Sequence, residues 1–244
     1  MSEETLSFGR EDKMYFCIMV LLFTSYEMSQ IKLTVQHLIT LLDWFGICIF
    51  SVTGALVASR KEMDIVGFAL LGSVTGIGGG TIRDVLLGVQ PIFWIAQPAY
   101  LVACVFVALA TFFVAHILHH RYRSLLWLDA IGLALFAVTE AGNALAHGAH
   151  PIIAVAMGVA SATFGGIIRD ILGGESPIIL RQEIYITAAL VGALVYVLLT
   201  GIGVSADGAV FAGFIAAFGL RAMALYWRLS LPRYRARGGA DELY

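Results

Sequence analysis

Two short segments place glycines and a charge pair inside apolar sequence. The first reads GGGTIRD, from Gly78 to Asp84, and the second reads FGGIIRD, from Phe164 to Asp170. Ionisable side chains are costly within a bilayer, and where they occur there they usually mark an ion or substrate path. Carboxylates along such a path attract cations, whereas arginines that point into it oppose them. The two segments therefore indicate passage of an ion or a small solute.

The composition places these segments in a membrane. Of the 244 residues, 59% are hydrophobic and 13% are charged, and the mean hydropathy is +0.87, which lies outside the range of soluble domains. Four windows without Asp, Glu, Lys or Arg reach the roughly 18 to 20 residues that a helix needs to cross a bilayer. They are residues 65–82, 92–120, 141–168 and 184–206. The net charge of −2 gives no indication of a nucleic-acid partner.

The apolar pattern predicts seven membrane-spanning helices and hence an all-α integral membrane protein. The expected spans are 36–59, 64–86, 93–118, 125–146, 151–172, 184–204 and 208–227. Residues 1–35 are an N-terminal extension, in which the apolar run from Met14 to Phe23 is too short to span; an interfacial segment and an uncleaved signal-like segment both stay open. Lys and Arg are denser on one side, so the positive-inside bias predicts an outside N-terminus and a cytoplasmic basic tail, residues 229–244.

The chain contains an internal duplication. A shift of 86 positions aligns residues 42–91 with 128–177 without a gap, and 17 of the 50 aligned positions are identical. The predicted repeats are residues 36–119 and 120–204, with three spans each, and residues 205–228 are a seventh helix outside them. An odd number of spans makes the second copy enter the membrane from the opposite side, so we expect inverted repeats. The seventh helix is expected to pack across both halves.

The glycine runs are predicted to weaken the second and fifth spans. Glycine costs about 1 kcal/mol relative to alanine in a helix interior, which favours a kink or a break. Close helix packing is the alternative, because Gly72 and Gly76 already have small-xxx-small spacing. A phosphate-binding loop does not fit, since the glycines end a helical run and no Walker lysine follows. The kink candidates are Gly78, Gly79, Gly80, Gly165 and Gly166.

Each arginine–aspartate pair lies about one helical turn beyond its glycines. The pairs are Arg83–Asp84 and Arg169–Asp170. Neighbours in sequence point about 100° apart on a helix, so an arginine need not bind the aspartate beside it. Snorkelling near a helix end is the alternative to lining a path. We expect the arginines to hold the kinked helices, to form a gate or to engage the aspartates.

The fourth span breaks the symmetry of the duplication. Glu140 and Asn143 stand where the first copy has Gly54 and Val57. Glu140 lies well inside an apolar span, so it is either a cation-attracting group on a pore wall or a protonated or hydrogen-bonded packing residue. The candidates for the pore wall are Glu140, Asn143, Thr53 and Thr139, and the two threonines occupy equivalent positions.

These features resemble the prokaryotic branch of the TRIC family, the trimeric intracellular cation channels. The resemblance rests on the doubled G-G-x-x-R-D element, the two L-D-x-x-G helix starts at Leu42 and Leu128, and the three-plus-three-plus-one layout, and it covers residues 38–228. It implies a homotrimer with one K⁺- and Na⁺-conducting pore per protomer, lined by the glycine-kinked second and fifth helices with the first and fourth. The motif positions that carry over are Gly78, Gly79, Gly80, Arg83, Asp84, Gly165, Gly166, Arg169 and Asp170, and Phe164 replaces one glycine and is expected to narrow or gate one half.

Two other classes of protein are alternatives to the channel. A secondary transporter of a small amino acid such as glycine uses the same inverted-repeat architecture, with half-helix N-termini that bind the substrate carboxylate. An enzyme is disfavoured, because the histidines lie at span ends or in loops and no HExxH or Cys-His cluster is present. We expect no cofactor, no metal site and no nucleic-acid partner. The expected partners are K⁺, Na⁺ and membrane lipid, and the expected location is the inner membrane of a prokaryote.

Overall fold

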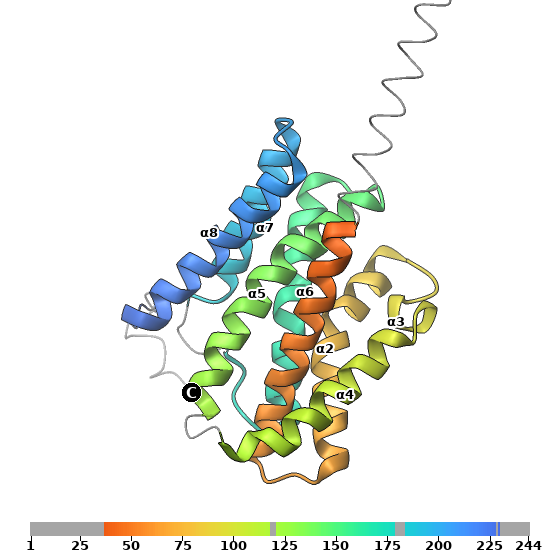
Figure 1. The fold of residues 1–244 in the computed structure, drawn as a ribbon. Helices are drawn as coiled ribbons and strands as arrows, with labels where there is room; N and C mark the ends of the chain where they lie inside the picture. The colour runs from red at the N-terminus through yellow and green to blue at the C-terminus, as the bar shows by residue number, and fades with distance from the viewer. Residues whose placement is uncertain (1–36, 118–120, 179–183, 228, 230–244) are drawn as a thin grey trace, which may run out of the picture. The chain divides into compact units, whose positions relative to one another are not determined.

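Every regular element in the described part of the chain is a helix (Figure 1). The computed structural model describes residues 37–117, 121–178, 184–227 and 229, so the predicted N-terminal extension and most of the basic tail lie outside the described residues. The described residues from Ile39 onward form one compact unit. Among the described residues, six helices are long and apolar enough to cross a membrane, and one further apolar helix is shorter. The chain is thus a multi-pass membrane protein.

The helix bounds follow the predicted spans to within four residues, with one exception. The first helix is His37–Arg60. It is followed by α2 (Ile65–Leu87), α3 (Phe93–Ala96), α4 (Ala99–Val114), η1 (Ala115–Ile117), α5 (Arg121–Ala146), α6 (Pro151–Leu172), α7 (Ile186–Gly201) and α8 (Ala206–Trp227). The helix α7 is the shorter apolar one. The exception is the third span, which the structure divides between α3 and α4.

A proline explains the divided third span. The prediction of one helix over residues 93–118 is wrong, because the chain leaves helical geometry at Gln97, the residue before Pro98. Pro98 has no backbone N–H and disfavours a helical conformation in the residue before it, so α3 ends there and α4 begins. The separated α3 turns the backbone N–H of Phe93 toward Asp84 Oδ2, at 2.8 Å. The helix α3, which was expected to be part of the third span, therefore supplies a hydrogen bond to the carboxylate of Asp84.

Local signals set the ends of α2 and α6. Asp64 caps α2, and its Oδ1 accepts a hydrogen bond from the backbone N–H of Gly67 at 2.8 Å. Gly88 ends the same helix in the left-handed conformation, with φ of 67°. His150 caps α6, and Pro151 occupies the first helical position. The caps Asp64 and His150 lie 86 positions apart, so both helices begin at equivalent points.

The helices α2 and α6 cross in backbone contact where their glycines lie. A side chain on Gly79 would collide with the carbonyl oxygen of Ser161, and a Cβ on Gly165 would lie 2.7 Å from the carbonyl oxygen of Thr75. Thr75 of α2 meets Gly165, whereas Gly79, further along α2, meets the earlier residue Ser161 of α6. The two helices are therefore antiparallel (Figure 1). Both run without interruption through their glycines. The predicted break into half-helices is wrong, because the glycines permit close packing; a bend within each helix stays a prediction.

The contacts of the core are reciprocal under the shift of 86 positions. Thr75 and Gly79 correspond to Ser161 and Gly165, so the two backbone contacts exchange their partners. The same exchange joins the first helix and α5: a Cβ on one glycine would meet an equivalent phenylalanine in the other helix. The residues are Gly46 with Phe136 and Gly132 with Phe50, and the rings of Phe50 and Phe136 lie 5.0 Å apart.

The last helix packs on the second predicted repeat. The principal neighbours of α8 are α5 and α7. Both lie in the second predicted repeat, whereas the sequence predicts that α8 packs across both repeats. Small residues explain the preference, since a Cβ on Gly192 of α7 would lie 2.6 Å from the Cβ of Ala217 on α8. Arg221 of α8 is fully buried, with its guanidinium 5.1 Å from the ring centre of Tyr185.

Alanine substitutions test the backbone contact. Gly79→Ala is expected to lower the free energy of unfolding by about 1–3 kcal/mol, because the new methyl group has to push α6 away. Gly219→Ala in α8 is the matched control: a Cβ there meets no atom within 4 Å, so alanine is neutral or stabilises by up to about 1 kcal/mol. Thermal unfolding in detergent, followed by tryptophan fluorescence, measures both. Equal stability of the two variants contradicts the close crossing.

Candidate functional site

Arg169 of α6 is fully buried and surrounded by acceptors. Its Nε donates to Asp170 Oδ1 at 2.9 Å, and its Nη1 donates to Asp129 Oδ1 on α5 at 2.7 Å and to Thr53 Oγ1 on the first helix at 3.1 Å. Asp170 Oδ2 accepts from the backbone N–H of Ile178 at 2.8 Å. The arginine thus joins three helices and the segment after α6. Arg169, Asp170, Asp129 and Thr53 are called the second arginine site.

Arg83 of α2 forms an equivalent but different cluster. Its Nε and Nη2 donate to Asp84 Oδ1 at 2.9 and 2.7 Å, and its Nη1 forms an ion pair with Glu140 on α5. Asp84 Oδ2 is held by the backbone N–H of Phe93. Asp43 is buried on the first helix, at the position equivalent to Asp129 of the second site. Arg83, Asp84, Glu140 and Asp43 are called the first arginine site.

One added carboxylate distinguishes the two sites. In the second site, the arginine Nη1 binds Asp129 and Thr53, whose equivalents in the first site are Asp43 and Thr139. In the first site, however, Nη1 of Arg83 donates to Glu140 instead. Glu140 comes from the half of the chain opposite to its arginine, just as Thr53 does in the second site. Each arginine therefore ties its own helix to a helix of the other half.

The two sites flank the glycine crossing. Arg83 lies four residues beyond Gly79, and Arg169 lies four residues beyond Gly165, which is about 6 Å along each helix axis. Because α2 and α6 are antiparallel, the arginines lie on opposite sides of the crossing. The arrangement places one charged cluster on each side of the point where the backbones approach most closely.

The structure decides between the sequence alternatives for the arginines. Each one binds the aspartate beside it, which was one of the expected roles. Arg83 is 4% exposed and Arg169 is 0% exposed, so neither snorkels to a membrane surface within this unit. The second arginine recruits Thr53, one of the pore-wall candidates.

The remaining candidates do not all meet at the arginines. Thr139 is buried beside Glu140. Asn143 is partly buried one turn further along α5, and its carbonyl oxygen lies 2.8 Å from Nδ1 of His147. The Phe164 ring is 37% exposed on α6. The predicted pore-wall and gating roles of Asn143 and Phe164 stay predictions.

Two aspartates belong to the sites without having been predicted there. In the sequence, Asp43 and Asp129 stand out only as parts of the two L-D-x-x-G helix starts. Both are at least nine-tenths buried, and Asp129 binds Arg169 directly. The signal that could have found them was available: an ionisable residue within an apolar span, repeated at an equivalent position, is a site candidate.

Several buried polar atoms around the two sites have no hydrogen-bond partner among the described residues. They are Asp43 Oδ1, Ser73 Oγ, Asp129 Oδ2, Thr139 Oγ1, Ser161 Oγ, Arg169 Nη2 and Tyr185 Oη. Buried polar groups are normally satisfied, and ordered water does so where the protein offers no partner. Most of these atoms belong to the first helix, α2, α5 and α6, the four helices that carry the arginine sites. The interior of this four-helix group therefore suits water.

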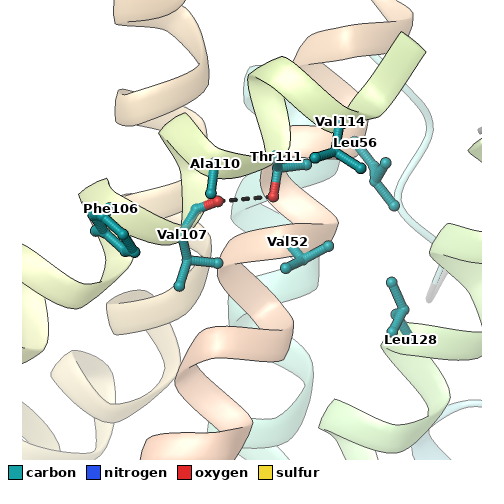
Figure 2. Close-up of a pocket in the computed structure, with 8 residues that line it drawn as sticks. All are labelled: Val52, Leu56, Phe106, Val107, Ala110, Thr111, Val114 and Leu128. Atoms are coloured by element: carbon teal, nitrogen blue, oxygen red, sulfur yellow. Dashed lines mark hydrogen bonds between the residues drawn. The ribbon is translucent and has the colours of Figure 1, made fainter. Parts of the chain in front are cut away.

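A separate hollow of about 340 Å³ lies between the first helix, α4 and α5 (Figure 2). It is lined by Val52, Leu56, Phe106, Val107, Ala110, Thr111, Val114 and Leu128. Its one hydroxyl group, on Thr111, donates to the carbonyl oxygen of Val107 at 2.8 Å. No residue of either arginine site lines it. The hollow is therefore an apolar crevice distinct from the charged clusters.

The fold and the paired sites define a polytopic helical membrane protein with a duplicated buried ion-pair cluster. The family model described as a glycine transporter matches residues 40–116 and 126–201. The crystal structure of the TRIC trimeric intracellular cation channel orthologue from Rhodobacter sphaeroides is similar, with 66% identity, a TM-score of 0.78, and coverage of 79% of this chain and 99% of that one.

Two bacterial membrane proteins are also similar to this chain. The UPF0126 membrane protein of Vibrio cholerae is 40% identical over 202 residues, 81% of this chain and 83% of the relative. The UPF0126 inner membrane protein YadS of Escherichia coli is 40% identical over 199 residues, 79% of this chain and 94% of the relative. The chain belongs to the TRIC family.

Two arginine variants test the structural weight of the buried site. Arg169→Gln is expected to lower the free energy of unfolding by about 3–5 kcal/mol, because it leaves Asp129 and Asp170 buried without a counter-charge. Arg60→Gln is the matched control. Arg60 pairs with Glu175 at 3.0 Å, and the two side chains are 27% and 12% exposed, respectively. Loss of such a partly exposed pair is expected to lower the free energy of unfolding by about 1 kcal/mol or less. Heating followed by size-exclusion chromatography measures both. Equally small losses contradict a buried ion-pair cluster at Arg169.

Proposed function

We propose that each protomer is a channel for monovalent cations, K⁺ and Na⁺, whose passage runs along the two arginine sites and past the glycine crossing. The observation that carries this proposal is the pair of buried charged clusters on opposite sides of one crossing. Charged groups in a membrane interior are expensive, and they usually face a water-filled path. The unsatisfied polar atoms on the same helices support such a path. The similar Rhodobacter sphaeroides protein is a cation channel.

The passage is proposed to lie within two inverted repeats, residues 36–119 and 120–204. Its lining would come from α2 and α6, bent at their glycines, together with the first helix and α5. The reciprocal contacts support a pseudo-two-fold axis in the membrane plane, because a two-fold operation exchanges partners in this way. The family model also matches the chain in two segments of similar length.

Carboxylates give the passage its preference for cations. Each arginine is occupied by the aspartate beside it and by a group from α5. The carboxyl groups outnumber the guanidinium groups in both sites, so negative charge remains after pairing. Excess carboxylate favours cations over anions in a pore. The arginines position the helices and keep the carboxylates in place.

Assembly and location complete the proposal. We propose a homotrimer in the inner membrane, surrounded by lipid, with the N-terminus outside and the C-terminus in the cytoplasm. The trimeric description of the Rhodobacter sphaeroides orthologue supports the assembly. The inner-membrane relative in Escherichia coli supports the location. The distribution of Lys and Arg supports the orientation.

Single-channel recording tests the passage. Purified protein in a planar bilayer is expected to give ohmic steps in K⁺ or Na⁺. Glu140→Gln is expected to lower the cation conductance roughly fivefold, the effect of losing about 1 kcal/mol of charge attraction in a hydrated site, and to shift the reversal potential toward the anion value. Asp207→Asn, on the exposed first turn of α8, is the matched control and should conduct normally. Unchanged conductance in Glu140→Gln removes this residue from the passage.

The alternative is a secondary transporter for a small amino acid such as glycine. The description of the matching family model favours it. The uninterrupted α2 and α6 weigh against it, because they offer no half-helix N-terminus for a substrate carboxylate. Saturable glycine uptake into proteoliposomes, without channel steps in K⁺, would establish the transporter. Channel steps in K⁺ that are unaffected by glycine would exclude it.

A further inference from the structure

The segments that follow α2 and α6 make the same backbone turn. The glycines in the two turns lie 86 positions apart and take the left-handed conformation, with φ of 67° and 64°. After α2, the backbone N–H of Val89 donates to the carbonyl oxygen of Asp84 at 2.9 Å. After α6, the N–H of Glu175 donates to the carbonyl oxygen of Asp170 at 2.8 Å. Each turn therefore holds the aspartate that binds the adjacent arginine.

The side chain of Glu175 ties the second turn to the end of the first helix. Its Oε1 lies 3.0 Å from Nη2 of Arg60, and its Oε2 accepts from Nη1 at 3.3 Å. Nζ of Lys61 lies 3.9 Å from the same Oε1. The Arg60 guanidinium group also lies over the ring of Tyr122 on α5, 4.8 Å from the ring centre. The ion pair thus joins the first helix, α5 and the turn after α6.

A close packing contact brings the same turn against the first helix. A Cβ on Gly173 would lie 2.5 Å from Cγ1 of Val57, so a larger residue would force the two segments apart. Val57 lies about one helical turn before Arg60 on the same helix. The turn after α6 is thus held to the first helix at two neighbouring points.

The turn after α2 is supported differently. The positions equivalent to the two partners of the ion pair are Ala146 and Val89, and neither side chain carries a charge. Support comes instead from α3, where Trp94 Nε1 donates to Thr81 Oγ1 on α2 at 3.0 Å. A charged contact therefore fixes one turn, and a neutral contact supports the other.

The ion pair is connected to the second arginine site by backbone bonds. The turn that carries Glu175 holds Asp170 twice, through its own N–H on the carbonyl oxygen and through the N–H of Ile178 on Oδ2. We propose that Glu175 and Arg60 are positioning residues for the proposed passage. Their ion pair fixes the carboxylate of Asp170, which binds Arg169. This proposal rests on the proposed channel function, because conductance is the property that the positioning changes.

The exposure of the ion pair sets the size of the expected effect. Both side chains are partly exposed, and such a pair contributes a modest free energy that salt screens. Its loss therefore loosens the turn without unfolding the chain. The change in conductance is expected to be several-fold and to shrink as the ionic strength rises.

Two variants that remove opposite charges test the positioning. Glu175→Gln and Arg60→Gln are both expected to lower the single-channel K⁺ conductance roughly threefold at about 0.1 M salt, because either one breaks the pair. If these groups acted only by attracting or repelling the permeant ion, the two variants would change the conductance in opposite directions. The double variant should conduct no worse than either single one, because the pair is lost only once.

Glu62→Gln is the matched control, because Glu62 is an exposed carboxylate in the turn that follows the first helix. It is expected to conduct like the wild type. At about 1 M salt, Glu175→Gln and Arg60→Gln should both approach the wild-type conductance. Changes of opposite sign in these two variants overturn the proposal. An additive loss in the double variant also overturns it.

Hydrogen exchange gives a readout that does not depend on conduction. The amide of Ile178 is expected to exchange roughly threefold faster in both variants, because the turn opens more often. The amide of Phe93, which donates to Asp84 in the first site, is the internal control and should keep its rate. Unchanged exchange at Ile178 overturns the positioning role. Faster exchange at Ile178 in a chain that conducts no cation supports that role and overturns the channel function, so the two failures are distinguishable.

Discussion

The backbone contact between α2 and α6 is the constraint on which the rest of the structure depends. Gly79 and Gly165 let each helix touch a carbonyl oxygen of the other, and no larger residue fits there. This contact sets the distance between the two segments. It also sets where Arg83 and Arg169 lie, one turn beyond the crossing in opposite directions. The charged clusters can reach α5 and the first helix only because the crossing is so close.

The energetics of charge in a membrane explain why the arginines are bound so completely. A buried guanidinium group without counter-charges would be strongly destabilising. Each arginine therefore binds its neighbouring aspartate, and each draws a second group from the opposite half of the chain, Glu140 or Thr53. The same bonds that satisfy the charge hold the four central helices together. The interactions that stabilise the helix bundle are thus the same ones that line the proposed passage.

A single substitution between the duplicated segments gives the two sites different chemistry. Where the first copy has Gly54, packed against the carbonyl oxygen of Leu71, the second has Glu140. The added carboxylate takes the arginine, and Asp43 is left with an unsatisfied oxygen. The second site has no additional glutamate, and Arg169 binds Asp129 and Thr53 directly. The first site binds its arginine through Asp84 and Glu140, and the second binds its arginine through Asp129 and Asp170.

Much of the fold was predictable because it depends on local properties. Apolar length determined the number of spanning helices, and the shift of 86 positions revealed the duplication and the equivalence of the charged motifs. Pro98 carried the signal for the divided third span, although the apolar run around it concealed that signal. The family was likewise accessible from the doubled motif.

The tertiary structure decided which groups meet. A helical period tells which residues share a face, but it does not tell which face meets a neighbouring helix. The sequence therefore left open whether the glycines break a helix or allow a contact, and whether Arg83 and Arg169 bind nearby or distant carboxylates. It also gave no role to Asp43 and Asp129. Those outcomes depend on the crossing of α2 with α6, an interaction between segments about 86 residues apart that no local pattern encodes.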